Sequence, residues 1–164
     1  MDVIVRPAVE GDGATIKALA HSESVNPYNL PWSRFLVAED EGVIVGIQQV
    51  RVHKGGTREV ATRVVRPEFR RRGIGTGLLL AAFDRETGPL YVQCGHQWTR
   101  YYERFGFRQV KVSELPPDLR GQHRLARMFV ALRSIWVRRR LRLSAMKRDA
   151  TRQSWVAPIQ ERPD

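Results

Sequence analysis

Cysteine is almost absent from this sequence, since Cys94 is the only one in 164 residues. A single cysteine excludes an intrachain disulfide, and we therefore expect a reducing, cytoplasmic location. One cysteine and four scattered histidines show no metal-ligand spacing, so we expect no metal site. Long apolar runs are also lacking: the longest, residues 74–83, contains two glycines and is too short to span a bilayer.

Acidic residues are missing from one part of the chain. Residues 119–148 carry 10 Arg or Lys and no Asp or Glu, whereas residues 1–118 carry 16 basic and 14 acidic side chains. The net charge of +11 therefore belongs mainly to this segment. Residues 119–148 are either the solvated face of a helix that packs on the domain, or a surface that attracts an anionic acceptor, a nucleic acid or a membrane. No array of stacking aromatics accompanies it, which disfavours specific nucleic-acid recognition.

The patterning predicts one domain over residues 1–148 and a flexible tail over residues 149–164. Alternation and turn residues predict strands at 3–7, 34–39, 43–52, 57–65, 90–94 and 107–112, and a closing strand from Arg140 that pairs with 107–112. Helices are predicted at 14–20, with Asp12 as its cap, at 75–86, at 98–105, and from Pro116 onward, and a short one within the connection 22–33. The last long helix carries an apolar stripe that we expect to pack on the domain, made of Leu125, Met128, Phe129, Leu132, Ile135 and Trp136.

A basic, glycine-rich turn joins the strand ending at Val65 to the apolar helix that follows. It reads Arg70-Arg71-Arg72-Gly73-Ile74-Gly75-Thr76-Gly77. A helix N-terminus presents unpaired N–H groups, and glycines let a phosphate approach them closely, so the turn is an anion cradle. The dinucleotide fingerprint is excluded because Leu78 stands where its third glycine belongs, and the P-loop lacks its Gly-Lys-Ser/Thr.

A second motif follows at a matching distance. Tyr102-Glu103-Arg104-Phe105-Gly106-Phe107 comes after one helix, one strand and one turn. Together, Arg70-x-x-Gly73-x-Gly75 and this Tyr-Glu-x-x-Gly-Phe segment resemble the GNAT superfamily of acetyl-coenzyme A-dependent N-acetyltransferases, over about residues 2–148. The stretch from Asn26 to Glu39 and Glu114-Leu115-Pro116 are similar to small bacterial members. Gly95 and Trp98 depart from the Asn and Ala of many members, on the acceptor side.

The resemblance implies an α/β (α+β) fold. A mixed, mostly antiparallel sheet of six or seven strands is flanked by helices, with a splayed strand pair at the acetyl-CoA site. It also implies that amides of residues 71–77 hold the pyrophosphate of acetyl-CoA and that the strand end at Val64 and Val65 pairs with the pantetheine arm. The implied cofactor-binding residues are Val64, Val65, Arg70, Arg71, Arg72, Gly73, Ile74, Gly75, Thr76 and Gly77.

The resemblance implies that Tyr102 is the general acid, since the phenol of a tyrosine is protonated at neutral pH and can donate its proton. For the base, Glu59 leads, acting directly or through water, and His53 and His96 are alternatives. Glu59 is equally suited to an ion pair with Arg58 or Arg63, and His53 to a solvated turn. Cys94 is expected as a small core residue without a nucleophilic role.

The sequence thus predicts transfer of an acetyl group from acetyl-CoA to a primary amine of a small molecule or protein. The alternative is a binding module on the same scaffold that contacts nucleic acid or a partner through residues 119–148, with acyl-CoA as ligand only. The acceptor's identity is not encoded in any recognisable motif. A homodimer through an edge strand or the long helix is compatible with the pattern.

Overall fold

Seven strands form one open sheet in the order β1-β2-β3-β4-β5-β7-β6. The structure is a computed structural model that describes residues 2–23, 29–136 and 142–150. The strands are β1 Ile4–Pro7, β2 Phe35–Asp40, β3 Val43–Val52, β4 Arg58–Val65, β5 Leu90–Gly95, β6 Arg108–Gln109 and β7 Leu143–Arg148. The helices are α1 Gly13–Ser22, α2 Ile74–Arg85, α3 Thr99–Glu103 and α4 Pro117–Trp136. Only β4 and β5 are parallel neighbours, which confirms the predicted mixed, mostly antiparallel sheet.

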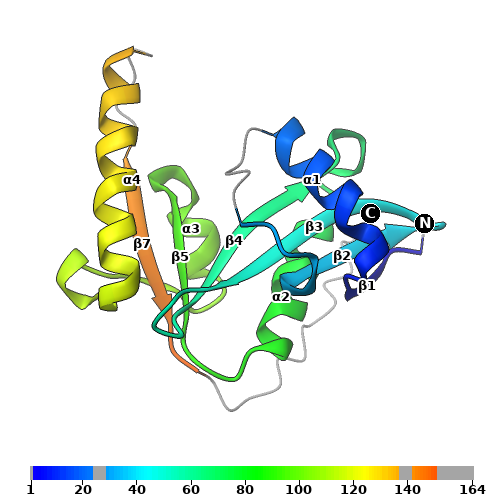
Figure 1. Cartoon of the computed structure of the whole chain (residues 1–164), viewed down its shortest axis with the longest axis horizontal. Coiled ribbons are helices and arrows are strands. Elements are labelled where there is room, and N and C mark those ends of the chain that lie inside the picture. The colour runs from blue at the N-terminus through cyan, green and yellow to red at the C-terminus, as the bar shows by residue number, and fades with distance from the viewer. Residues whose placement is uncertain (1, 24–28, 137–141, 151–164) are drawn as a thin grey trace, which may run out of the picture.

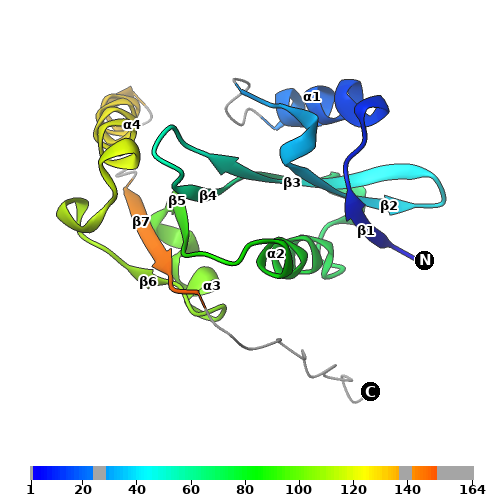
Figure 2. The ribbon, with the colours of Figure 1, turned by 60° about the horizontal axis from the view of Figure 1, so that its bottom comes forward.

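Helices cover both faces of the sheet (Figures 1 and 2). α1 and α4 lie on one face, and α2 and α3 lie on the other. Under α2 the core is built from Leu78, Leu79 and Val60, while Ile16 and Phe35 belong to the core under α1. These two apolar layers hold the sheet between them, because each strand of its centre buries side chains on both faces.

A β-bulge at Thr62 reverses the direction of the side chains along β4. Gln48 pairs with Arg63 and Gln49 with Ala61, so Thr62 is the extra residue, and its φ is 31°. Without a bulge, Val60 and Val64 would point the same way; here they belong to the clusters on opposite faces. Side chains alternate between the two faces on both sides of the bulge, but the alternation after Thr62 is reversed relative to the alternation before it.

The parallel pair opens after three residues. β4 pairs with β5 only from Arg58–Leu90 to Val60–Val92, and beyond these partners the two strands diverge (Figure 1). This is the splayed strand pair that the family resemblance implied. The divergence leaves the second half of β4 and the end of β5 free of each other, which creates room for a ligand.

The C-terminal strand occupies an interior place in the sheet. β7 pairs antiparallel with β6, as predicted, through Arg108–Lys147 and Gln109–Met146, but it also pairs along its whole length with β5. The predicted strand 107–112 is only two residues long, since a 3-10 turn at Val112–Glu114 ends it and Glu114 Oε1 accepts the Lys111 N–H at 2.8 Å. The closing strand was predicted to start at Arg140, and residues 140 and 141 lie outside the described residues.

Two members of the predicted apolar stripe of α4 do not pack on the domain. Leu125 and Met128 are each 52 % exposed, whereas Leu119 and His123, four residues apart, are buried against the domain. The packed face is therefore offset from the stripe along the helix circumference. The side chains of the other stripe members, Phe129, Leu132, Ile135 and Trp136, lie outside the described part.

Near the N-terminus the predicted cap of α1 is not formed, and a short helical turn stands at the end of the connection where a short helix was predicted. Asp12 precedes α1, but its carboxylate accepts the Val9 N–H and pairs with Arg6 at 2.8 Å, and it makes no capping bond to the helix. The connection after α1 contains a 3-10 turn at Trp32–Arg34, and residues 24–28, like the predicted tail beyond residue 150, lie outside the description. Within the described residues, no helix has the length and apolar character needed to cross a membrane.

Candidate active site

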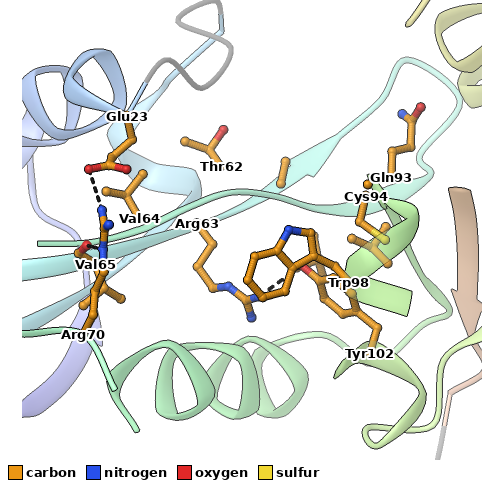
Figure 3. Close-up of a pocket in the computed structure, with 14 residues that line it drawn as sticks. Glu23, Thr62, Arg63, Val64, Val65, Arg70, Gln93, Cys94, Trp98 and Tyr102 are labelled. Carbon is orange, nitrogen blue, oxygen red and sulfur yellow. Dashed lines mark hydrogen bonds and ion pairs between the residues drawn. The ribbon is translucent and has the colours of Figure 1, made fainter. Parts of the chain in front are cut away.

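A cavity of about 620 Å³ lies where β4 and β5 diverge (Figure 3). Its walls are the bulged half of β4, the end of β5 and the first turns leading to α3. The lining residues are Glu23, residues 60–65, Arg70, residues 92–95, Trp98 and Tyr102. It therefore joins the glycine turn to the second sequence motif, which lie far apart along the chain.

Tyr102 reaches this cavity from α3. The side chain is 7 % exposed and is wedged edge-on between Tyr101 and Phe107, with ring centroids 5.2 and 5.5 Å away. Burial raises the pKa of the phenol above its usual value, against a lowering by the neighbouring Arg63 charge. At neutral pH the phenol is protonated and can donate a proton inside the cavity.

The backbone of the glycine turn is left-handed at Arg71 and Gly73. Gly73 precedes α2 with a φ of 79°, a conformation that any side chain would disfavour, and Arg71 has a φ of 63°. The amides of Ile74 and Gly75 open α2, so no carbonyl of that helix can accept from them. The amides of Thr76 and Gly77 instead donate to the Gly73 carbonyl at 2.9 Å. These two amides are therefore already used and do not point to a bound anion.

Arg70 stands between the turn and the cavity. Its Nη2 pairs with Glu23 Oε1 at 2.5 Å, and its Nε donates to the Val65 carbonyl at 2.9 Å. Among the predicted cofactor-binding residues, Val64, Val65 and Arg70 line the cavity, whereas Arg71 to Gly77 are not part of its wall. The sequence motif marks Arg70 but not Glu23, which comes from the end of α1.

Glu59 is buried behind the cavity rather than on its wall. It is 4 % exposed, and its two oxygens are engaged: Oε2 by His53 Nε2 at 2.9 Å and by Arg51 at 3.7 Å, and Oε1 by Gln93 Nε2 at 2.9 Å. The pairing with Arg58 or Arg63 considered above is not formed: Arg58 pairs with Glu86, and the bulge sends Arg63 to the α2 face. Glu59 meets the cavity only through Gln93.

The carboxylate dictates the orientation of its neighbours. Because an ionised Glu59 only accepts, the amide nitrogen of Gln93 must face it, and the amide oxygen must face His123. His123 Nδ1 lies 2.8 Å from that oxygen and therefore carries a proton. Burial, helped by the Arg127 charge and opposed by Glu59, lowers the pKa of His123. Gln93 and His123 carry no sequence signal, because only the register of β4, β5 and α4 brings them to Glu59.

The remaining candidates take other places. His53 is not a solvated turn residue, since its side chain is 8 % exposed and bound to Glu59. His96 lies outside the cavity wall, with Nδ1 3.2 Å from the Ser144 hydroxyl. Cys94 is buried, as predicted, and lines the cavity, and burial raises the pKa of its thiol to about 11, which disfavours a nucleophilic thiolate.

Residues 31–109 match a family model described as the acetyltransferase (GNAT) domain. These residues form a GNAT acetyltransferase domain. The matched stretch contains the strands that diverge, the glycine turn and Tyr102, so the GNAT motifs and the cavity coincide. A search of curated proteins finds no significant match to the GNAT sequence described here.

Solved structures share the GNAT fold. N-acetylglutamate synthase of Neisseria gonorrhoeae, complexed with coenzyme A and N-acetyl-glutamate, superposes with a TM-score of 0.70 at 20% identity, over 93% of this chain and 36% of that one. The present chain thus spans about a third of that synthase. A Mycobacterium tuberculosis protein in complex with CoA gives 0.65 at 22% identity, over 90% and 99% of the two chains. The ribosomal-protein-S18-alanine N-acetyltransferase of Escherichia coli gives 0.60 at 12%, over 95% and 99%. At these identities the likeness shows the fold.

Proposed function

We propose that this protein transfers an acetyl group from acetyl-CoA to a primary amine of a small-molecule or protein acceptor. The observation that carries the proposal is the position of Tyr102. Its phenol lines a cavity between diverging strands, inside a domain whose family transfers acetyl groups. Coenzyme A in two of the similar structures supports acetyl-CoA as the donor.

The cofactor would lie along the route from the glycine turn to Tyr102. The amides of Ile74 and Gly75, together with the positive charge of Arg70 to Arg72, suit the pyrophosphate. Beyond Val60, β4 has no partner in β5, so the backbone of Val64 and Val65 could pair with the pantetheine arm there, in competition with Arg70 Nε at the Val65 carbonyl. An N–H there would also stabilise the oxyanion that grows on the thioester carbonyl.

The chemistry needs two proton transfers. The neutral amine attacks the thioester carbon, the carbon–sulfur bond breaks, and the leaving sulfur takes a proton from the Tyr102 phenol. The amine loses its extra proton to a base. Glu59 is proposed for this step, with the proton passed through water, since its carboxylate does not line the cavity. His53 and His96 remain alternative bases.

Replacing Tyr102 by Phe tests the proposal. Loss of a general acid lowers turnover by about a hundredfold, so we expect Tyr102→Phe to reduce kcat to that extent with little change in KM for acetyl-CoA. The measurement is thiol release from acetyl-CoA over a panel of amino acids, polyamines, aminoglycosides and peptides. Tyr91→Phe is the matched control, because Tyr91 is also buried but belongs to a different apolar cluster and is not part of the cavity wall. Turnover by Tyr102→Phe equal to the unmodified protein at every pH would remove the assigned role.

A second candidate function is contact with nucleic acid or a protein partner through residues 119–148, with acyl-CoA as ligand only. The observation in its favour is the outer face of α4, where exposed Leu125 and Met128 lie beside exposed Arg124 and Arg127. Arg124, Arg127 and Met128 line a shallow depression with Val112. Binding of DNA that weakens with added salt would support this function.

A further inference from the structure

The side chain of Arg63 enters the cavity beside Tyr102 (Figure 3). Arg63 Nη2 lies 3.3 Å from the Tyr102 hydroxyl, and Nη1 lies 3.0 Å from the Tyr101 hydroxyl. The guanidinium carbon also stands 4.7 Å and 5.3 Å from the centres of the two rings. One guanidinium therefore bridges the two adjacent phenols of α3 from strand β4.

No carboxylate neutralises this guanidinium within the described part of the chain. Ion pairs there involve Arg6, Arg51, Arg58, Arg70 and Arg108, and Arg63 is not among them. Its partners are the two phenol oxygens and, at 3.5 Å, the Gly75 carbonyl at the start of α2. A cation directed at neutral oxygens is best satisfied when one of them becomes negative.

A guanidinium has donors only, and this decides how Tyr102 holds its own hydrogen. Arginine cannot accept a hydrogen bond, so the Tyr102 oxygen must accept from Arg63. The hydroxyl hydrogen of Tyr102 then points away from Arg63. Since Tyr102 lines the cavity, the hydrogen is left available for a group bound there.

We propose that Arg63 is a positioning residue for Tyr102: it holds the phenol as a proton donor directed into the cavity and stabilises the phenolate left after the proton has moved. The inference rests on the proposed acetyl transfer. In that step the Tyr102 O–H bond breaks, the S–H bond of coenzyme A forms as the carbon–sulfur bond is cleaved, and the phenolate beside Arg63 later regains a proton from solvent.

The electrostatic surroundings agree with this assignment. Three groups act on Tyr102 from the elements packed around it: Arg63 of β4, Cys94 of β5 and Tyr101 of α3. Arg63 lowers the pKa of the phenol, whereas burial, Cys94 and Tyr101 raise it. Arg63 is thus the one group among these that favours the charged product of the proton transfer.

Substitution of Arg63 tests the inference through the pH profile. We expect Arg63→Met to lower kcat by roughly tenfold near neutral pH, since a charge-assisted hydrogen bond to the phenolate is lost. The alkaline limb, where Tyr102 loses its proton, should move to higher pH. Arg63→Lys, which keeps the charge and donates without accepting, should recover part of both effects. Arg58→Met is the matched control, because Arg58 lies on the same strand but pairs with Glu86 outside the cavity.

A double substitution separates an effect through Tyr102 from any other. In a Tyr102→Phe background, Arg63→Met should cause little further loss of kcat, because the group on which Arg63 acts is gone. Equal losses in both backgrounds would overturn the inference. So would a raised KM for acetyl-CoA with kcat and the alkaline limb unchanged, which would assign Arg63 to cofactor binding.

A readout without turnover keeps the inference distinct from the proposed function. NMR of protein with 13C-labelled tyrosine follows each phenol during a pH titration, and the Tyr102 signal is the one absent from Tyr102→Phe. In Arg63→Met its midpoint should rise, and an unchanged midpoint in a folded variant overturns the inference. If the unmodified protein released no thiol with any amine, the proposed function would fail while this titration would still decide the role of Arg63.

Discussion

At the scale of single residues, hydrogen bonds behind the cavity determine which atoms of Gln93 and His123 carry hydrogen. Glu59 accepts from His53 and Gln93, and Gln93 accepts from His123. His123 is 2 % exposed, and burial lowers its pKa below the ordinary 6.5. A second proton on its ring would place a charge in this buried position, where it would also face Arg127. The network therefore keeps His123 neutral in the folded protein.

This neutrality predicts an acid-dependent loss of stability. The unfolded chain takes up a proton on His123 near pH 6.5, before the folded protein does, so the free energy of unfolding falls as the pH drops from there toward the lowered folded pKa. We expect His123→Gln, which stays neutral, to show a smaller fall between pH 7.5 and 5 in urea denaturation. His21→Gln, at an exposed position of α1, should keep the full fall. Equal slopes in His123→Gln and His21→Gln would contradict the account.

At the scale of elements, the distance between α2 and the sheet is set at Gly46. A Cβ at this position of β3 would lie 3.1 Å from Leu78 Cδ1, 3.3 Å from Ile74 Cγ2 and 3.3 Å from the Val64 carbonyl oxygen. α2 therefore packs so close to β3 that a side chain at position 46 would contact it too tightly. Because the glycine turn is the start of α2, this spacing also positions the proposed pyrophosphate site.

Two glycine substitutions should have opposite effects on stability. Gly46→Ala forces Leu78 and Ile74 to shift, and we expect it to lower the free energy of unfolding by about 1–3 kcal/mol. Gly121→Ala places a methyl in open space within α4, and we expect it to raise that free energy by roughly 0.5–1 kcal/mol. Urea denaturation measures both, and a neutral Gly46→Ala would show that α2 adapts without cost.

The elements that sequence patterns predict best are those defined by local rules. The hairpin of β2 and β3 turns at Glu41 and Gly42, both with positive φ, as the Asp-Glu-Gly sequence indicates. α2 follows from its glycine turn and its unbroken apolar run. Long-range register escapes such rules: the bulge at Thr62 arises from pairing between β3 and β4, and nothing in the alternation of β4 marks it.

The residues of the candidate site also divide into those that local motifs mark and those that only long-range register brings together. Tyr102 and the glycine turn are found from two local motifs and the family resemblance that they carry. Arg63, Gln93 and His123 are not, because their roles depend on which face each strand presents after the bulge and on where α4 packs. The exposure of Leu125 and Met128 on α4 was not predicted either, since helical periodicity identifies a face but does not say which face the tertiary structure buries.

At the scale of the whole molecule, charge is distributed unevenly. Residues 1–118 are close to neutral, whereas residues 119–148 carry 10 positive and no negative side chains. The cavity and its glycine turn lie in the first part, and exposed Arg124 and Arg127 of α4 lie in the second. Acetyl transfer and any binding of polyanions can therefore be altered independently.

Charge reversal on α4 tests that independence. If residues 119–148 bind nucleic acid, Arg124→Glu with Arg127→Glu should weaken DNA binding and reduce its dependence on salt by about one per lost phosphate contact, with thiol release unchanged. Lys17→Glu with Arg34→Glu makes the same charge change at exposed positions of the nearly neutral part. If both double variants lost DNA binding to a similar extent, the loss would be due to the change in net charge, and a specific site on α4 would be excluded.

The interior place of β7 has a consequence for how the molecule is made. On the ribosome, everything that lines the cavity, residues 23 to 102, is synthesised before residues 143–148. Until those last residues emerge, β5 has an unpaired edge, and β6 has no strand beside it. The part that lines the cavity is thus translated first, and the sheet around it is completed only when residues 143–148 have been made.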